Sequence, residues 1–188
     1  MYENLKKKFG QNFLIDNNIL NKITNLINYE KLEILEIGPG DGRLTDNILN
    51  KNPKNLDLVE IDKDLFINLK KKYSRNTKIN IENENILNYK INKHYDLIIS
   101  NLPYNVSSQV LVQLSTLKKK PKNMILMFQK EFASRLLDIN LNSINALVNC
   151  FYDVKLRFNV SKNCFRPMPK VNSTILTFDK KENFLLKE

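Results

Sequence analysis

The sequence predicts an α/β protein built on a doubly wound, mostly parallel β-sheet. Short apolar runs, typical of buried strands, alternate with amphipathic stretches of about ten residues, typical of helices. With 188 residues, of which 42% are hydrophobic and 27% charged, the chain can form one well-packed core. A glycine-rich turn follows the first apolar run, where sheets of this kind hold a ligand. Together these observations favour a single ligand-binding α/β domain.

The elements follow from the apolar pattern taken in chain order. Asp16 can cap a helix over 17–28, whose apolar residues fall on one face, and Asp62 can cap the helix over 63–73. The last two predicted strands are expected to pair antiparallel at the sheet edge. Residues 1–16 precede this domain as a basic, irregular arm, and the domain itself is expected over 17–180. The pattern predicts strands at 32–37, 56–61, 78–81, 95–100, 123–128, 154–160 and 171–178, and further helices at 43–51, 63–73, 106–117, 130–137 and 141–151.

Composition excludes several classes of protein. No apolar run approaches the roughly 20 residues that span a bilayer, and the N-terminus lacks the apolar core of a signal peptide. We therefore expect a cytoplasmic protein with no membrane contact. Two cysteines, Cys150 and Cys164, and one histidine are too few for a disulfide framework or a clustered metal site. We expect no metal.

The charge balance points to a polyanionic partner. The formal net charge is +10, and lysine triplets stand at Lys6–Lys8, Lys70–Lys72 and Lys118–Lys120. Any one triplet is equally well explained as a solvated helix end. Three on one basic chain favour nucleic acid, although charge alone does not say which one, and Lys6, Lys7 and Lys8 are the candidates that we expect to contact it.

The glycine-rich turn predicts a nucleoside cofactor. Gly38, Gly40 and Gly42 let the backbone turn sharply and let a ligand approach the next helix. Glu36 precedes the turn, and Glu60 ends the second predicted strand, where a carboxylate accepts hydrogen bonds from ribose hydroxyls. The third glycine comes one residue too early for the dinucleotide pattern G-x-G-x-x-G. The spacing therefore favours S-adenosylmethionine, which has no pyrophosphate, over NAD.

The tetrapeptide Asn101-Leu102-Pro103-Tyr104 predicts the chemistry. By itself it is equally an ordinary strand-to-helix turn, but it falls at the same sheet edge as the glycine turn. The amino group of adenine is a poor nucleophile, because its lone pair is delocalised. Two acceptors on its hydrogens, the side-chain oxygen of Asn101 and the carbonyl of Leu102, would direct that lone pair at a sulfonium methyl without a general base. Tyr104 would stack on the base, and Phe165 could cover its other face.

The order of several motifs resembles the rRNA adenine N6-dimethyltransferases, in particular the KsgA group, whose relatives include the Erm resistance methyltransferases. The resemblance runs from about 7 to 176 and implies a class I, Rossmann-like methyltransferase with a seven-stranded sheet. It further implies dimethylation of two adjacent adenosines in the 3′-terminal hairpin of small-subunit rRNA in a pre-ribosomal particle. We expect a monomer. The motifs are KFGQNFL (8–14), EIGPG (36–40), NLPYN (101–105), QKE (129–131) and FRPMPKV (165–171).

The resemblance also assigns roles to single residues. It places Tyr104 and Phe165 against a target base taken out of its stack. The family usually has aspartate where Asn85 stands, a segment at 138–143 is altered, and the family's small helical domain would begin at 181–188. An Erm-like enzyme acting on large-subunit rRNA and a non-catalytic ribosome-assembly factor remain alternatives. The residues that the resemblance implies for the cofactor pocket are Asn12, Leu14, Gly38, Glu60, Asn85 and Asn101.

Overall fold

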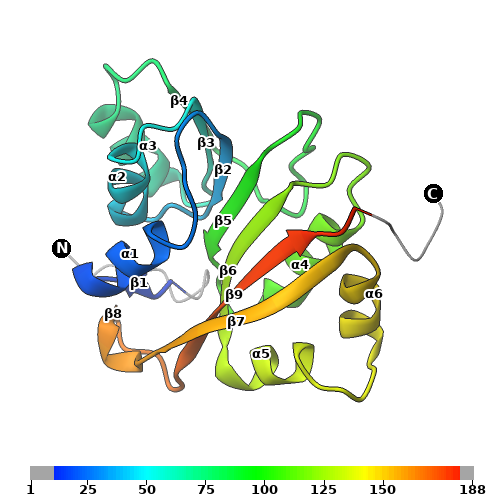
Figure 1. Cartoon of the computed structure of the whole chain (residues 1–188). Coiled ribbons are helices and arrows are strands. Elements are labelled where there is room, and N and C mark those ends of the chain that lie inside the picture. The colour runs from blue at the N-terminus through cyan, green and yellow to red at the C-terminus, as the bar shows by residue number, and fades with distance from the viewer. Residues whose placement is uncertain (1–10, 183–188) are drawn as a thin grey trace.

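The computed structural model describes residues 11–182, and its framework is one seven-stranded sheet (Figure 1). The strand order is β4-β3-β2-β5-β6-β9-β7. The first five run parallel, whereas β9 is antiparallel to both of its neighbours. The predicted sheet is confirmed, with the reversed strand lying one place in from the edge. The bounds are β2 (Glu33–Ile37), β3 (Asn55–Val59), β4 (Ile79–Glu82), β5 (Leu97–Asn101), β6 (Asn123–Gln129), β7 (Tyr152–Val160) and β9 (Ser173–Lys180).

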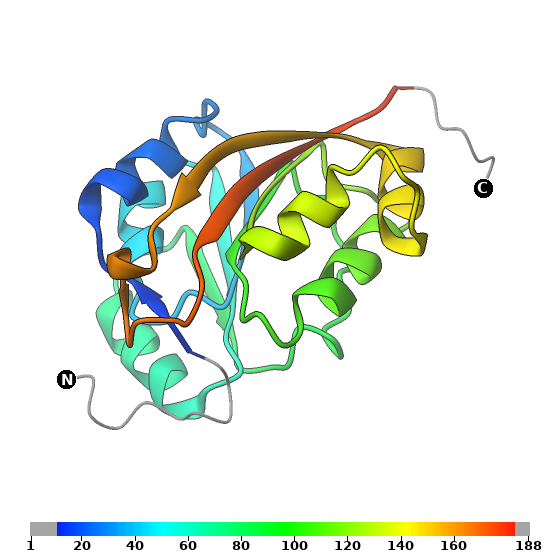
Figure 2. The same cartoon turned by 90° about the horizontal axis from the view of Figure 1, so that it is seen from below.

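Helices cover both faces of this sheet, and residues 11–182 place three on each face (Figures 1 and 2). The carboxylate of Asp16 caps α1 by accepting the N–H groups of Asn18 and Ile19, as the sequence predicts. One layer holds α1 (Asn17–Thr24), α2 (Arg43–Leu49) and α3 (Lys63–Lys72), and the other holds α4 (Ser107–Ser115), α5 (Lys130–Leu136) and α6 (Ser143–Phe151). Strands in the centre are therefore buried on both faces.

That burial explains the nearly continuous apolar sequence of the central strands. In β2, Ile34 packs into the core under α1 and α2, and Leu35 packs into the core under α4. In β5, Leu97 and Ile98 divide in the same way. Because both faces of the sheet need apolar side chains, the central strands do not alternate polar and apolar residues. The bounds of the seven strands lie within about two residues of those predicted from the sequence.

Helix α1 ends at Thr24, four residues before the predicted end. The hydroxyl of Thr24 donates to the carbonyls of Leu20 and Asn21, and the hydroxyl of Tyr29 donates to the carbonyl of Ile23. Side chains thus satisfy the last carbonyls of the helix, so that its last turn is closed without further helical residues.

A second, two-stranded sheet was not predicted. Strand β1 (Phe13–Leu14), in the arm expected to be irregular, pairs antiparallel with β8 (Phe165–Arg166). The pairing continues through a hydrogen bond of 2.9 Å from the N–H of Ile15 to the carbonyl of Cys164. It fixes the described part of the arm, residues 11–16, close to the edge of the sheet where β2 and β5 end (Figure 1).

Candidate active site

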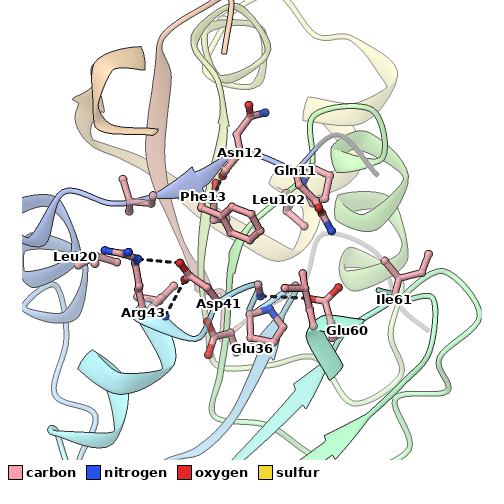
Figure 3. Close-up of a pocket in the computed structure, with 18 of the residues that line it drawn as sticks. Gln11, Asn12, Phe13, Leu20, Glu36, Asp41, Arg43, Glu60, Ile61 and Leu102 are labelled. Carbon is pink, nitrogen blue, oxygen red and sulfur yellow. Dashed lines mark hydrogen bonds and ion pairs between the residues drawn. The ribbon is translucent and has the colours of Figure 1, made fainter. Parts of the chain in front are cut away.

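A cavity opens at the carboxyl ends of the parallel strands, beneath the arm (Figure 3). Its volume is about 810 Å³, which includes space that is open to solvent. A second cavity of about 530 Å³ shares Gly38, Ile61, Leu102 and Pro103 with it, so the two adjoin. They lie where β2 neighbours β5 and the connections diverge to the two faces of the sheet, the usual ligand crevice of an open α/β fold. Their size suits a small organic ligand.

The glycine turn forms the floor of the first cavity. Gly38 and Gly40 have φ of 65° and 62°, in the left-handed region that favours glycine. A Cβ atom on Gly38 would meet nothing within 4 Å, so this position keeps the floor open. A Cβ atom on Gly40 would lie 2.6 Å from Cε1 of the Phe13 ring. Gly40 is therefore needed for the arm to pack on the turn.

Glu60, the residue directly after β3, is held by two backbone hydrogen bonds. Its Oε2 accepts the N–H of Gly40 at 3.1 Å, and its Oε1 accepts the N–H of Asp62 at 2.9 Å. The side chain is buried, and burial raises the pKa of this carboxyl, whereas the two backbone N–H groups act against that shift. Each carboxylate oxygen keeps acceptor capacity for a ligand hydroxyl.

Asp62 connects Glu60 to the arm. Its Oδ1 caps α3 by accepting the N–H of Asp64, and its Oδ2 accepts a 3.1 Å hydrogen bond from Nε2 of Gln11. Figure 3 shows Gln11 and Phe13 pointing from the arm toward the side of the cavity that holds Glu36 and Glu60. The arm thus closes over the cavity through one polar and one aromatic contact.

The side-chain amide of Asn101 has one defined orientation. Its Nδ2 donates to the backbone carbonyl of Asn12 at 3.0 Å. Among residues 11–182, no donor pairs with its Oδ1 or with the carbonyl oxygen of Leu102. Pro103 makes the following turn, in which its carbonyl accepts the N–H of Val106. Two acceptors therefore stand side by side in the chain at the cavity, both without a protein partner in this range.

Tyr104 lines the same cavity, and its ring is anchored at its far end. The hydroxyl groups of Tyr104 and Ser173 are 2.7 Å apart and share a hydrogen bond. Burial raises the pKa of the phenol, so it stays neutral. Ser173, the first residue of β9, is fully buried and holds the hydroxyl end of the ring in place.

Phe165 does not lie where the sequence reasoning placed it. It lines neither cavity; its side chain is fully buried in the core, in a cluster that includes Leu14 and Leu20. The β1–β8 pairing turns it inward, where removing the whole ring from water is favourable. Its ring offers no open face to a base in this structure.

The remaining predicted positions are placed as follows. Leu14 is nearly buried and borders the first cavity. Asn85 borders the second, and its Oδ1 already accepts the N–H of Leu87 at 3.0 Å. The lysines at 6, 7 and 8 lie outside the described residues.

In the other two lysine triplets, Lys70, Lys71, Lys118 and Lys119 are exposed, whereas Lys72 and Lys120 make contacts within the protein. Lys120 is buried, with its Nζ donating to the carbonyl of Leu117 and lying 4.1 Å from the centre of the Phe151 ring. Lys72 pairs with Asp46 at 2.7 Å. Side-chain packing and ion pairing thus use one lysine from each triplet.

Sequence reasoning did not single out Gln11 or Phe13 as site residues, and it read Asp62 only as a helix cap. All three border or close the cavity. Their roles depend on contacts across at least 27 positions of the sequence, such as Phe13 with Gly40, and no local pattern carries them. Residues 11–182 contain no group of three or more His, Cys, Asp or Glu placed to hold a metal, and no helix long and apolar enough to cross a membrane.

Comparison with known proteins agrees with this geometry. The family model for ribosomal RNA adenine dimethylase matches residues 2–188. "Ribosomal RNA small subunit methyltransferase A" of Pelagibacter ubique is 39% identical over 98% of this chain and 73% of its own length. The protein of the same name from Hydrogenobaculum sp. is 39% identical over 95% of this chain and 71% of its own.

Solved structures extend the comparison to the fold. A dimethyladenosine transferase from Plasmodium falciparum superimposes with a TM-score of 0.83 at 31% identity, covering 90% of this chain and 64% of that chain. The 23S rRNA methyltransferase ErmE gives the same TM-score at 24% identity, covering 94% and 72%, and shows the fold alone. The chain therefore belongs to the ribosomal RNA adenine dimethylase family, the S-adenosylmethionine-dependent methyltransferases that act on adenine in ribosomal RNA.

Proposed function

We propose that this chain transfers methyl groups from S-adenosylmethionine to N6 of two adjacent adenosines in the 3′-terminal hairpin of small-subunit (16S) rRNA. It would act as a monomer on a pre-ribosomal particle in the cytoplasm. One observation supports this chemistry. The amide nitrogen of Asn101 donates to the carbonyl of Asn12, so the Oδ1 of Asn101 and the carbonyl of Leu102 together form a pair of acceptors. The printed names of the curated relatives support the small-subunit target.

The residues around the two cavities fit the cofactor. The open position at Gly38 admits a ligand close to the backbone, and each Glu60 oxygen keeps a lone pair for a ribose hydroxyl. Asn85 in the adjoining cavity would accept the adenine amino group through the remaining capacity of its Oδ1. Asn12, Leu14 and the arm close the other side. Bound there, S-adenosylmethionine supplies a methyl group activated by its sulfonium charge.

The chain itself then has to orient the target amino group. The Oδ1 of Asn101 and the carbonyl of Leu102 would each accept one N6 hydrogen, which draws the nitrogen toward tetrahedral geometry and frees its lone pair. Positive charge develops on N6 during transfer, and these two acceptors stabilise it. Tyr104, held by Ser173, would stack on the extruded base. No side chain has to remove a proton before transfer, because N6 loses it afterwards.

The test is methyl transfer from labelled S-adenosylmethionine to unmethylated small subunits, with large subunits in parallel and the modified nucleotides mapped. We expect label on two adjacent adenosines of the small-subunit hairpin and none on the large subunit. Label on large-subunit rRNA would replace this proposal with an Erm-type target. Cofactor binding without transfer to either subunit would replace it with a non-catalytic role.

A further inference from the structure

Glu36 is a buried carboxyl group in the cofactor cavity that the mechanism above does not use. It is the next-to-last residue of β2, only 1% exposed, and it borders the cavity with Gly38 and Glu60 (Figure 3). Its Oε2 accepts a 2.7 Å hydrogen bond from the hydroxyl of Thr45 in α2. Within residues 11–182 no donor pairs with its Oε1. That oxygen is left for whatever fills the cavity.

The charges around Glu36 disfavour its ionised form. Asp46 of α2 and Glu60 after β3 are like charges. The positive charge of Lys72 in α3 lowers the pKa of Glu36. The Nζ of Lys72 lies 2.7 Å from the carboxylate of Asp46, however, so Asp46 already offsets the charge of Lys72. In the glycine turn, Asp41 is tied to Arg43 at 2.8 Å.

Two tyrosines also face this carboxyl, and neither donates to it. The hydroxyl of Tyr73 donates to Asp46 and to the carbonyl of Gly42, and that of Tyr29 donates to the carbonyl of Ile23. Burial, and then the like charges, raise the pKa of Glu36 to about 8 despite the Thr45 hydrogen bond, which lowers it. At pH 7 a carboxyl with such a pKa is ionised in only about one molecule in ten.

The ligand of this cavity changes its charge during the reaction. S-adenosylmethionine carries a sulfonium, an ammonium and a carboxylate, whereas the product S-adenosylhomocysteine has lost the sulfonium charge. We propose that the protonation of Glu36 responds to this difference in charge. Glu36 is protonated in the protein without ligand and releases its proton to solvent when S-adenosylmethionine binds. It is protonated again when only the product is bound. Glu36 would thus be a specificity-determining residue that favours substrate over product.

The physical basis is the cost of a buried charge. A carboxylate in a low-dielectric site is costly alone and is stabilised by a nearby cation. The substrate supplies an additional cation and the product does not, so only the substrate offsets ionisation of Glu36. Because binding releases a proton, affinity for S-adenosylmethionine should rise with pH up to about 8 and level off above. This inference rests on the cofactor and is independent of which rRNA is the target.

The test counts protons by isothermal titration calorimetry at pH 7 in phosphate and in Tris, which differ in ionisation enthalpy. S-adenosylmethionine and S-adenosylhomocysteine are titrated into the wild-type protein and into Glu36→Gln, whose amide oxygen can still accept the Thr45 hydroxyl. The ligand α-amino group titrates near pH 7.7–8.0, and comparing two proteins with the same ligand cancels its contribution. We expect the wild type to release about 0.9 proton more than the variant with S-adenosylmethionine, as follows from the ionised fraction at pH 7.

The preference for S-adenosylmethionine over the product should also fall roughly tenfold in Glu36→Gln, the equivalent of one pKa unit. Equal proton release by both proteins, or an unchanged preference, would overturn the proposal. A second variant, at Thr45, tests the proposal if Glu36→Gln does not fold. Thr45→Val removes the hydrogen bond that stabilises the carboxylate and should move the pH profile of affinity to higher pH, whereas Thr45→Ser should keep it. A profile that drops equally at every pH in Thr45→Val would mean a purely structural role.

Discussion

The contact between the Phe13 ring and Gly40 predicts a large difference between two otherwise similar substitutions, Gly40→Ala and Gly38→Ala. Both glycines have φ in the left-handed region, so alanine at either should cost about 1–2 kcal/mol of backbone strain. Gly38→Ala adds no clash, because nothing lies within 4 Å of the new Cβ. It is therefore the matched control.

Gly40→Ala adds a steric cost on top of that strain. Its Cβ would lie 2.6 Å from Cε1 and 2.9 Å from Cδ1 of Phe13, so the ring has to move. Phe13 is only 9% exposed, and overpacking at such a site costs about 1–3 kcal/mol. We expect Gly40→Ala to lower the free energy of unfolding by about 2–5 kcal/mol, the sum of the two terms.

Urea denaturation followed by far-UV circular dichroism measures both variants, and Phe13→Ala completes a double-mutant cycle with Gly40→Ala. Since the clash needs both side chains, the double variant should be more stable than the sum of the single effects predicts, by about 1–3 kcal/mol. Equal losses in Gly38→Ala and Gly40→Ala, or strict additivity in the cycle, would show that the arm does not pack on the turn.

Three further substitutions test the site. Asn101→Ala should lower single-turnover methyl transfer by about 10²–10³, as for loss of one preorganised contact; rates like those of the wild type would remove Asn101 from the mechanism. Glu60→Gln should weaken S-adenosylmethionine binding by about 1.5–3 kcal/mol, the worth of a hydrogen bond to a charged group, and calorimetry showing unchanged affinity would exclude the ribose contact. Asn85→Asp should tighten binding roughly threefold or more, because a carboxylate accepts hydrogen bonds about twice as strongly as an amide; weaker binding in the same assay would contradict it.

Much of the fold could be predicted because its signals are local. Each buried strand is a short apolar run. Asp16 and Asp62 are predicted from the sequence as helix caps, and both cap their helices in the structure. The glycine turn and the Asn101–Tyr104 segment were placed at one sheet edge because the carboxyl ends of parallel strands must meet there.

The remainder depends on contacts that no local pattern records. The strands β1 and β8 have two residues each, too few for any periodicity, and only their pairing defines them. Phe165 belongs to a motif associated with base binding, yet the same pairing turns it into the core. The hydrogen bond that orients the Asn101 side chain joins it to Asn12, 89 positions away. The sequence therefore predicts that the amide takes part in the site but not which way the amide is turned.

The pairing of β1 with β8 also sets the order in which the enzyme can become functional during its synthesis. Phe13 leaves the ribosome near the start of translation, but its strand partner Arg166 follows more than 150 residues later. At about 5–20 residues per second, this delay is about 8 to 30 seconds. Until then the floor of the cavity can fold while its cover has nothing to pair with. A nascent chain should therefore retain cofactor poorly until β8 has emerged, so that translation itself delays the start of methylation.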